Sequence, residues 1–494
     1  MRFIRKQNSC FSYYIDTLAS RIVITSPEMF KTLLQIWPQW VATLIAILLP
    51  ISIGLAIGWT SPYLALLTNE ESLFLITSEE ASWIASLLPL GRLLGAVVGS
   101  LCVAYLDSKT SLLLTGVPLI GGWICIIFAD SAVLLYTFRI LSGMSMGMLF
   151  SCYPLYIGEI SMPSIRGALV GLVINGLPLG TLLGNIMGPK MSMMYFGIIS
   201  LVVTICYLGT FPFLPQSPHY FVRRGDMERA RKAIQWYNRK TDTRSELENV
   251  ELYVKSSSSV TVRERLKRIK EPKNRRSFQM IIILFIFMQL SGLNSIVFYM
   301  EIIVREAMVT SIAPSTVVII ISAAAIICGW IGAFAIDRYG RRILLAISTI
   351  SVTIGILLLA LHFWLLDYDY DPRNLEWLVI LAFLVFTLLF MGVVPVPTTM
   401  LSELFQSDLK SLAGFVASVT SAIFAFIAAK TYQPLVDIMS EQYLFCAYAV
   451  LMVGCLIYSM VKVPETKGKT LQEIQDMMAI GNSGKTQKRN DDKA

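Results

Sequence analysis

Apolar runs about as long as a bilayer is thick recur along the whole chain. A helix needs about 20 mostly apolar residues to cross a membrane. Twelve candidate spans lie near residues 40–63, 82–104, 111–129, 131–153, 167–189, 193–214, 279–303, 316–336, 343–366, 376–400, 411–431 and 443–463. The pattern predicts an all-α membrane protein with twelve transmembrane helices.

The composition agrees with this fold class. The chain has 494 residues, of which 55% are hydrophobic and 15% are charged, against about 25% charged in soluble domains. The eight cysteines show no metal-ligand spacing, and only two histidines occur. We therefore expect no metal and no cofactor. The sequence contains no Gly-rich phosphate loop, HExxH or nucleophile elbow, so we do not expect an enzyme.

Charge outside the spans predicts the topology. The segment 215–278 carries seventeen Lys and Arg against eight Asp and Glu, whereas the loops at 69–80 and 367–376 are acidic. Positive loops stay in the cytoplasm, so this segment and both termini are predicted to be cytoplasmic and the protein to lie in the cell membrane. Next to membrane spans, the basic residues suit lipid headgroups better than nucleic acid.

Within that segment, the spacing of Ala230, Ile234 and Tyr237 predicts a short cytoplasmic helix over Met227–Asn238. The predicted organisation is a cytoplasmic N-terminal segment (1–39), a six-helix half (40–214), a helical linker (215–278), a second six-helix half (279–463) and a cytoplasmic tail (464–494).

The two halves repeat at an offset of roughly 240 residues, which is typical of transporters. The stretch Pro154–Arg166 is echoed by Pro397–Lys410, and the charged stretch at 332–342 has a fainter counterpart at 99–109. Halves related by an axis along the membrane normal place a substrate site between them, near the bilayer midplane.

Polar residues interrupt the seventh span at Met288–Tyr299. Gln289, Ser291 and Asn294 lie where a lipid-spanning helix needs hydrocarbon, and burying an amide without a partner costs about 2–7 kcal/mol. The two amides are about 140° apart on a regular helix. A break at Ser291-Gly292 would turn both into one cavity. A contact in which the amides bond a neighbouring helix is equally compatible.

Several motifs together resemble the sugar porters of the major facilitator superfamily, and most closely the insect facilitated trehalose transporters. They are GWTSP at 58–62, RILSG at 139–143, PLYIGEISMPSIRG at 154–167, PQSPHY at 215–220, QLSGLN at 289–294, GAFAIDRYGRR at 332–342, PVP at 395–397, SELF at 402–405 and VPETKGKTLQEI at 463–474. The resemblance covers nearly all of residues 40–475 and implies a small-molecule sugar substrate carried by alternating access.

The resemblance also implies roles for particular residues. It places sugar contacts on Gln289 and Asn294, with aromatic packing from Phe298 and Tyr299. It implies an inner gate made of charged residues at the cytoplasmic ends of spans. These gate residues are Glu159, Arg166, Asp337, Arg338, Arg341, Arg342, Glu403, Lys410 and Glu465. Such charges can pair across the halves when the inner side closes; the alternative is that they only anchor the helix ends and set the topology.

Thr60 takes the place of an aspartate that proton-coupled relatives carry in the first span. Without that carboxylate the resemblance favours facilitated diffusion, that is, uniport. Arg139 in the fourth span is then expected to be structural rather than part of a gate. We expect the monomer to be the functional unit, although the sequence does not define an oligomeric state.

Some positions that carry an amide or a tryptophan in the family carry other side chains in this chain. Met288, Ile174 and Ala325 replace amide side chains, while Thr398 and Ala422 replace tryptophans. The cavity should therefore be wider and less polar than that of a glucose carrier. The leading hypothesis is facilitative transport of trehalose or a hexose. A transport-impaired sugar sensor or scaffold and a carrier of a non-sugar organic solute are the alternatives.

Overall fold

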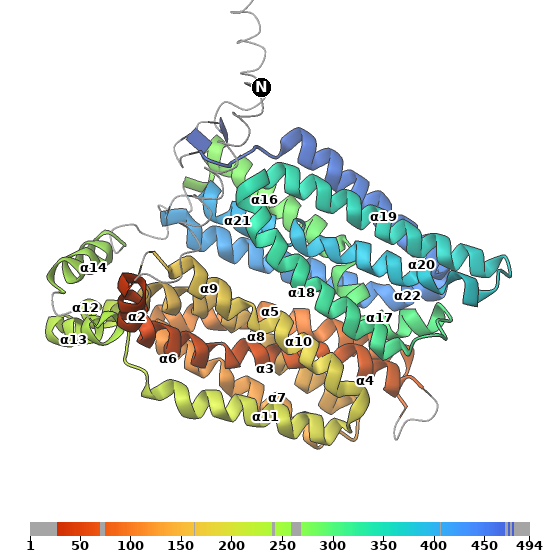
Figure 1. Cartoon of the computed structure of the whole chain (residues 1–494), viewed down its shortest axis with the longest axis horizontal. Coiled ribbons are helices and arrows are strands. Elements are labelled where there is room, and N and C mark those ends of the chain that lie inside the picture. The colour runs from red at the N-terminus through yellow and green to blue at the C-terminus, as the bar shows by residue number, and fades with distance from the viewer. Residues whose placement is uncertain are drawn as a thin grey trace, which may run out of the picture.

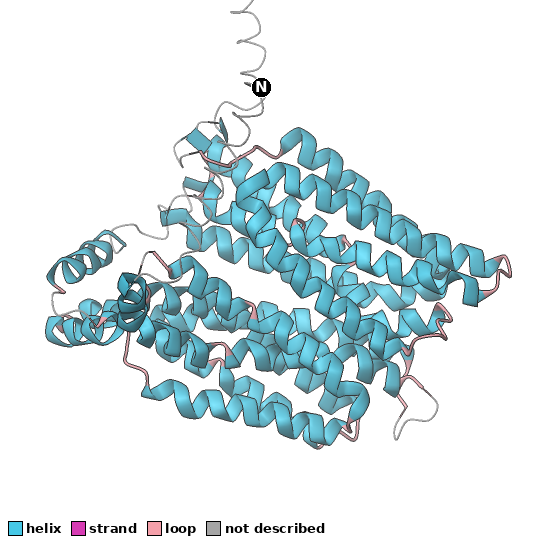
Figure 2. Ribbon diagram, viewed as in Figure 1, coloured by secondary structure: helices cyan, strands magenta, loops and turns pink. Residues whose placement is uncertain are grey.

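Every regular element among the residues described in the computed structural model is a helix (Figure 2). The structure describes residues 27–69, 75–162, 164–239, 243–257, 268–405, 407–469, 473–474 and 477–478. Most of the predicted N-terminal segment and the end of the predicted tail lie outside these ranges.

The helices of the first half build six apolar spans. They are α2 (Pro27–Ala46), α3 (Leu48–Gly58), α4 (Thr60–Leu67), α5 (Ser78–Tyr105), α6 (Ser108–Leu114), α7 (Gly116–Ile127), α8 (Ala132–Ile160), α9 (Arg166–Ile174), α10 (Gly176–Met187), η1 (Gly188–Lys190), α11 (Met193–Thr210) and η2 (Phe211–Phe213). Where two or three consecutive helices follow one line they form a single span, as α2, α3 and α4 do over Ile36–Leu67.

The second half is built in the same way. Its helices are α16 (Pro272–Leu290), α17 (Leu293–Glu306), α18 (Pro314–Tyr339), α19 (Arg341–Asp367), α20 (Pro372–Phe386), η3 (Thr387–Met391), α21 (Pro395–Leu404) and α22 (Ser407–Lys462). The described residues hold 11 helices that are apolar and long enough to cross a membrane. The last, Leu412–Lys462, has 51 residues, and Ser440 at φ 64° divides it into two spans. The predicted twelve-helix fold in two halves is therefore confirmed.

Three linker helices lie together at one end of the bundle (Figure 1): α12 (Pro218–Arg223), α13 (Met227–Asn238) and α14 (Arg244–Ser257). We call this the linker end and the other the opposite end. The bounds predicted for α13 are those observed, and its buried residues include Ala230, Ile234 and Tyr237. The helix docks on the first half, because the Tyr237 hydroxyl lies 3.1 Å from that of Tyr156.

Local sequence explains where individual helices begin. Thr77 caps α5: its hydroxyl accepts from the Glu80 N–H at 3.2 Å, and the Glu80 carboxylate accepts from the Thr77 N–H at 2.8 Å. This reciprocal pair satisfies two backbone donors that the first turn leaves free. Proline opens α16, α18 and α20, where its missing N–H costs no hydrogen bond.

Glycine lets α5 and α8 approach until their backbones touch. A Cβ added at Gly95 would lie 2.0 Å from the Met144 carbonyl oxygen, and one added at Gly143 would lie 2.2 Å from the Leu88 carbonyl oxygen. Small residues at four-residue spacing favour such packing within a bilayer, where dispersion and close backbone contact replace the hydrophobic effect. The first half is therefore a tightly packed unit.

Candidate functional site

The seventh span is broken where the sequence predicted. Helix α16 ends at Leu290 and α17 begins at Leu293, and Gly292 between them adopts φ 81°. This left-handed conformation costs glycine little and is unfavourable for residues with a Cβ. The break changes the directions in which the polar side chains on either side point.

The break brings the two predicted amides into contact. Asn294 Nδ2 donates to Gln289 Oε1 at 2.6 Å, and Gln289 Nε2 donates to the Ser421 hydroxyl of α22 at 2.7 Å. Gln289 and Ser421 are buried, whereas Asn294 keeps part of its surface exposed. Gln289 therefore makes the contact with a neighbouring helix that was one of the two hypotheses, and the partly exposed amide of Asn294 leaves the shared-cavity hypothesis a prediction.

The hydrogen-bonded network of Asn294, Gln289 and Ser421 includes a fourth residue that the sequence analysis did not predict. Arg92, in the middle of α5, donates through Nη2 to the same Ser421 hydroxyl at 2.7 Å. Its side chain is partly exposed, while its Nε is buried without an acceptor. An ionisable residue inside an apolar span is a functional candidate by default. The arginine in the run LLPLGRLLGAVV was therefore the signal available in the sequence.

The two aromatic residues of the predicted site are buried in this conformation. Phe298 lies under the guanidinium of Arg139, whose Cζ is 5.5 Å from the ring centroid. Tyr299 stacks on Tyr432 of α22 with ring centroids 4.6 Å apart. Both rings pack against protein here.

Arg139 is held by backbone and aromatic groups. Its Nε donates to the Ile84 carbonyl and its Nη1 to the Ala56 carbonyl, both at 2.8 Å. Thr60 is buried one turn after Ala56. No carboxylate among the described residues pairs with Arg139. These contacts agree with a structural role for this arginine.

At the opposite end, the two halves bond each other directly. The Glu301 N–H of α17 donates to the Ser61 hydroxyl of α4 at 3.0 Å, and Arg305 Nη1 donates to the Ala65 carbonyl at 3.0 Å. Glu301 is buried and forms an ion pair with Arg305 at 2.9 Å. Beside them, Lys430 Nζ of α22 lies 4.0 Å from the ring centroid of Trp83 in α5. The halves are therefore closed against each other at this end (Figure 1).

The gate residues of the second half bond one another. Arg341 donates to Glu403 at 3.0 Å and to Asp337 at 2.9 Å. The Glu465 carboxylate accepts from the backbone N–H groups of Arg341 and Arg342, at 3.0 Å each. Burial alone would raise the pKa of Glu465, but the backbone N–H groups of Lys467, Arg341, Arg342 and Thr466 together lower it.

In the first half, Glu159 is bonded to Arg223 at 3.0 Å and to the Ser108 hydroxyl at 2.5 Å. Arg166 Nη2 donates to the Ser161 carbonyl at 3.4 Å. The side chains of Arg338 and Lys410 are exposed. Among the described residues, no ion pair joins the gate residues of one half to those of the other. The ion pairs that Glu159, Asp337, Arg341 and Glu403 form thus lie within their own half.

The five positions that depart from the family pattern differ in their exposure. Met288 and Ala422 are buried, Ile174 and Ala325 are partly exposed, and Thr398 is exposed. The Thr398 hydroxyl donates to the Pro395 carbonyl at 2.8 Å.

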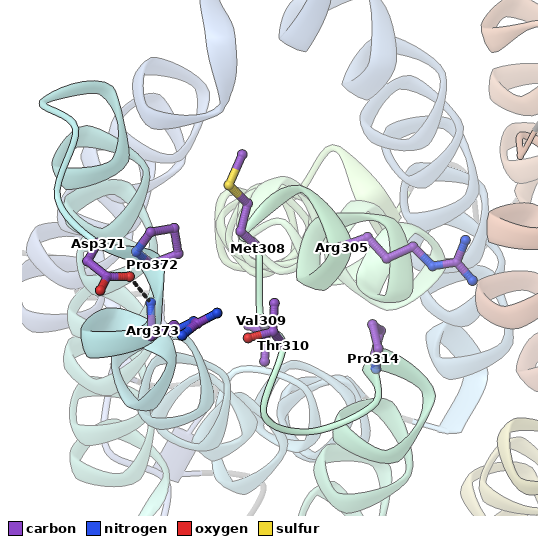
Figure 3. Close-up of a pocket in the computed structure, with 8 residues that line it drawn as sticks. All are labelled: Arg305, Met308, Val309, Thr310, Pro314, Asp371, Pro372 and Arg373. Atoms are coloured by element: carbon purple, nitrogen blue, oxygen red, sulfur yellow. Dashed lines mark hydrogen bonds between the residues drawn. The ribbon is translucent and has the colours of Figure 1, made fainter.

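A separate pocket of about 420 Å³ opens at the opposite end (Figure 3). It lies between the loop after α17 and the start of α20, and Arg305, Met308, Thr310 and Arg373 are among its lining residues. Asp371 accepts from the Arg373 N–H at 3.0 Å across its rim. The amides at the helix break do not line this pocket.

Two six-helix halves, with a polar break in the seventh span, form the architecture that is typical of membrane carriers. The profile of the family described as "Sugar (and other) transporter" matches residues 41–478. The chain belongs to this family of transporters, which are not enzymes.

Known relatives support the assignment. The chain is 31% identical over 451 residues to the facilitated trehalose transporter Tret1 of Polypedilum vanderplanki, an alignment that covers 90% of this chain and 89% of that protein. It is 29% identical over 448 residues to Tret1 of Drosophila mojavensis, covering 90% of this chain but 52% of that protein. It spans about half the length of that Drosophila relative.

Solved structures show the fold. The inward-open conformation of the E. coli xylose transporter XylE superimposes with a TM-score of 0.74 at 18% identity, covering 89% of this chain and 99% of that one. The major facilitator superfamily proton:xylose symporter XylE bound to 6-bromo-6-deoxy-D-glucose gives 0.70 at 18% identity, covering 90% and 100%. The chain therefore has the major facilitator fold.

Proposed function

We propose that this protein is a facilitative sugar carrier, a uniporter of trehalose or a hexose, that works by alternating access in the cell membrane. One observation carries the proposal: the amides of Gln289 and Asn294 meet at the break in the seventh span, and Ser421 links them to Arg92 of the first half. An amide both donates and accepts hydrogen bonds, so such a pair can replace water around sugar hydroxyls. The names of the trehalose transporters that the chain resembles suggest the first substrate to test.

In this proposal the linker end faces the cytoplasm, together with both termini. The conformation described is then closed to the outside, because Ser61, Ala65, Glu301 and Arg305 hold the halves together there. Opening to the outside requires these contacts to break, and closing the inside brings the gate residues of the two halves together. Each exposed ion pair is worth only about 0–1 kcal/mol, so several acting together bias the equilibrium rather than lock it.

Sugar contact begins at Asn294, whose amide is partly exposed. The Gln289 amide becomes available when it exchanges its bond to Ser421 for one to the sugar. Phe298 and Tyr299 lie about 1.1 and about 1.4 turns further along α17. They supply apolar surface when the opposite end opens.

Uniport is supported by the surroundings of Arg139. Thr60 carries no ionisable group, and two nitrogens of the guanidinium donate to backbone carbonyls rather than to a carboxylate. Arg139 is therefore not paired with a carboxylate that could take up and release a proton during transport. This supports uniport rather than proton coupling through Arg139.

Counterflow of radiolabelled trehalose and D-glucose into liposomes that contain the purified protein tests the proposal. A carrier accelerates exchange when unlabelled sugar is preloaded, and protein-free liposomes provide the baseline. A transport-impaired sensor would bind sugar, detected as a thermal shift, with no accelerated exchange. Absence of both exchange and binding would refute the sugar assignment.

A further inference from the structure

Arg92 faces the interface between the two halves. It lies midway along α5 of the first half, yet its Nη2 bonds Ser421 of α22 in the second half at 2.7 Å. The same hydroxyl accepts from Gln289 Nε2, also at 2.7 Å. A single residue, Ser421, therefore links the guanidinium of the first half to the proposed sugar amides of the second half.

Arg92 has no acidic partner in the part of the chain that the structure describes. No carboxylate among the described residues forms an ion pair with it. Glu301, the buried acid at the interface, pairs with Arg305 at the opposite end. A charge deep in a bilayer protein is costly unless it is paired, so an unpaired one marks a binding or transport role.

Arg139 also lacks an acidic partner, but it differs from Arg92 in being completely buried. Two of its nitrogens donate to backbone carbonyls, and the rings of Trp59, Phe138 and Phe298 surround its guanidinium. Its Nη2 is also buried without an acceptor, but Arg139 has no exposed surface through which a ligand could reach it. For Arg92 the one hydrogen bond observed is to a hydroxyl, its Nε is buried without an acceptor, and part of its surface is exposed. Arg92 therefore has donor capacity left for a ligand.

We propose that Arg92 makes the proposed sugar site at Gln289 and Asn294 selective for an anionic sugar. Such a sugar carries a carboxylate, as a hexuronate does. The planar guanidinium matches a carboxylate with two parallel hydrogen bonds, and Gln289 and Asn294 serve the hydroxyls of the same molecule. The inference rests on the proposed function, since it assigns the substrate class of that site. The bond between Arg92 and Ser421 is then exchanged for bonds to the substrate.

Competition in the liposome assay tests this assignment, with D-glucuronate and D-glucose as the two competitors against labelled trehalose. They differ at one carbon, which is a carboxylate in glucuronate and a hydroxymethyl group in glucose. For the wild-type protein we expect glucuronate to halve exchange at about a tenfold lower concentration than glucose, the size expected for hydrogen bonds to a charged group. For Arg92→Gln this preference should disappear.

The matched control is Lys232→Gln. It removes one positive charge from an exposed pair with Glu228 on α13, and the preference for glucuronate should remain. Arg92→Lys keeps the charge but loses the paired donors, so an intermediate preference is expected. If Arg92→Gln does not fold, the competition with the wild-type protein and with Arg92→Lys still tests the preference for glucuronate.

The two proposals fail separately. Trehalose exchange that glucose inhibits at least as well as glucuronate would overturn the anion assignment and leave the sugar carrier standing. If no sugar exchanges at all, the proposed function fails, and the anion assignment is then judged by binding alone. In that case, the anion assignment is supported if glucuronate stabilises the wild-type protein against heat and does not stabilise Arg92→Gln. It is refuted if glucuronate stabilises both proteins equally or stabilises neither.

Discussion

Asn294 donates its amide to Gln289 across the break between α16 and α17, with 2.6 Å between Nδ2 and Oε1. Residues five apart on a regular helix point about 140° away from each other. They meet here because Gly292 adopts a left-handed conformation that interrupts the regular helix between α16 and α17. The contact fixes the orientation of the two amides that form the proposed sugar site.

The first prediction concerns this contact. Replacing Asn294 by alanine removes the partly exposed amide, and the loss of one hydrogen bond of about 0.5–1.5 kcal/mol should lower sugar exchange roughly two- to tenfold. Met288→Ala is the matched control, because Met288 is buried, apolar and close in sequence. Counterflow in liposomes measures both. Equal losses in the two variants would remove Asn294 from the site.

Transport should respond little to an imposed pH gradient. Thr60 cannot carry a proton, and Arg139 bonds carbonyl oxygens rather than a carboxylate. We expect initial uptake rates with acid outside and with no gradient to agree closely. Strong stimulation by external acid would contradict uniport, and Glu301→Gln would then show whether this buried acid carries the proton.

Weakening the closure at the opposite end should shift the conformational equilibrium. Ser61→Ala removes the acceptor of the Glu301 N–H, and a loss of about 0.5–1.5 kcal/mol changes a two-state ratio roughly two- to tenfold. Distances between spin labels at the exposed residues Leu75 and Ile438 report the change. Thr137→Ala, whose hydroxyl bonds within its own helix, should leave the distances unchanged.

Alanine at Gly95 should destabilise the first half. The added methyl group would lie 2.0 Å from the Met144 carbonyl oxygen, and overpacking of this kind typically costs about 1–3 kcal/mol. We expect a lower unfolding temperature in detergent. Gly171→Ala provides the comparison, because nothing lies within 4 Å of the added Cβ, and it should be neutral or slightly stabilising. Similar effects at both positions would exclude close packing as the cause.

The attachment of the chain after α22 should weaken in acid. The folded-state pKa of Glu465 is lowered, so its contribution to stability is present above the unfolded-state value of about 4.3 and is lost as the pH falls through the folded-state pKa. The difference in unfolding temperature between the wild type and Glu465→Gln should therefore shrink as the pH drops from 7 to below 4. A constant difference would show that the carboxylate charge plays no part.

Much of the fold was set by local sequence. The twelve spans follow from apolar length, since a bilayer forces the backbone to form its hydrogen bonds within each helix. The break at Gly292 and the bounds of α13 were also predictable, because backbone permissiveness and helical spacing act over a few residues. One local expectation needs refinement: Glu80, assigned to an acidic loop, belongs to the first turn of α5, where it completes the cap with Thr77.

Only the tertiary structure decided which polar groups meet. The sequence cannot tell that Arg92 and Gln289, almost two hundred residues apart, share the Ser421 hydroxyl. Nor does it show that Arg341 pairs within its own half. Such contacts depend on which helices are neighbours and on which end of the bundle is closed, and the same charges can be satisfied in more than one way. Hydrophobicity determined that these helices cross a membrane; the packing of the two halves determined which side chains lie between them.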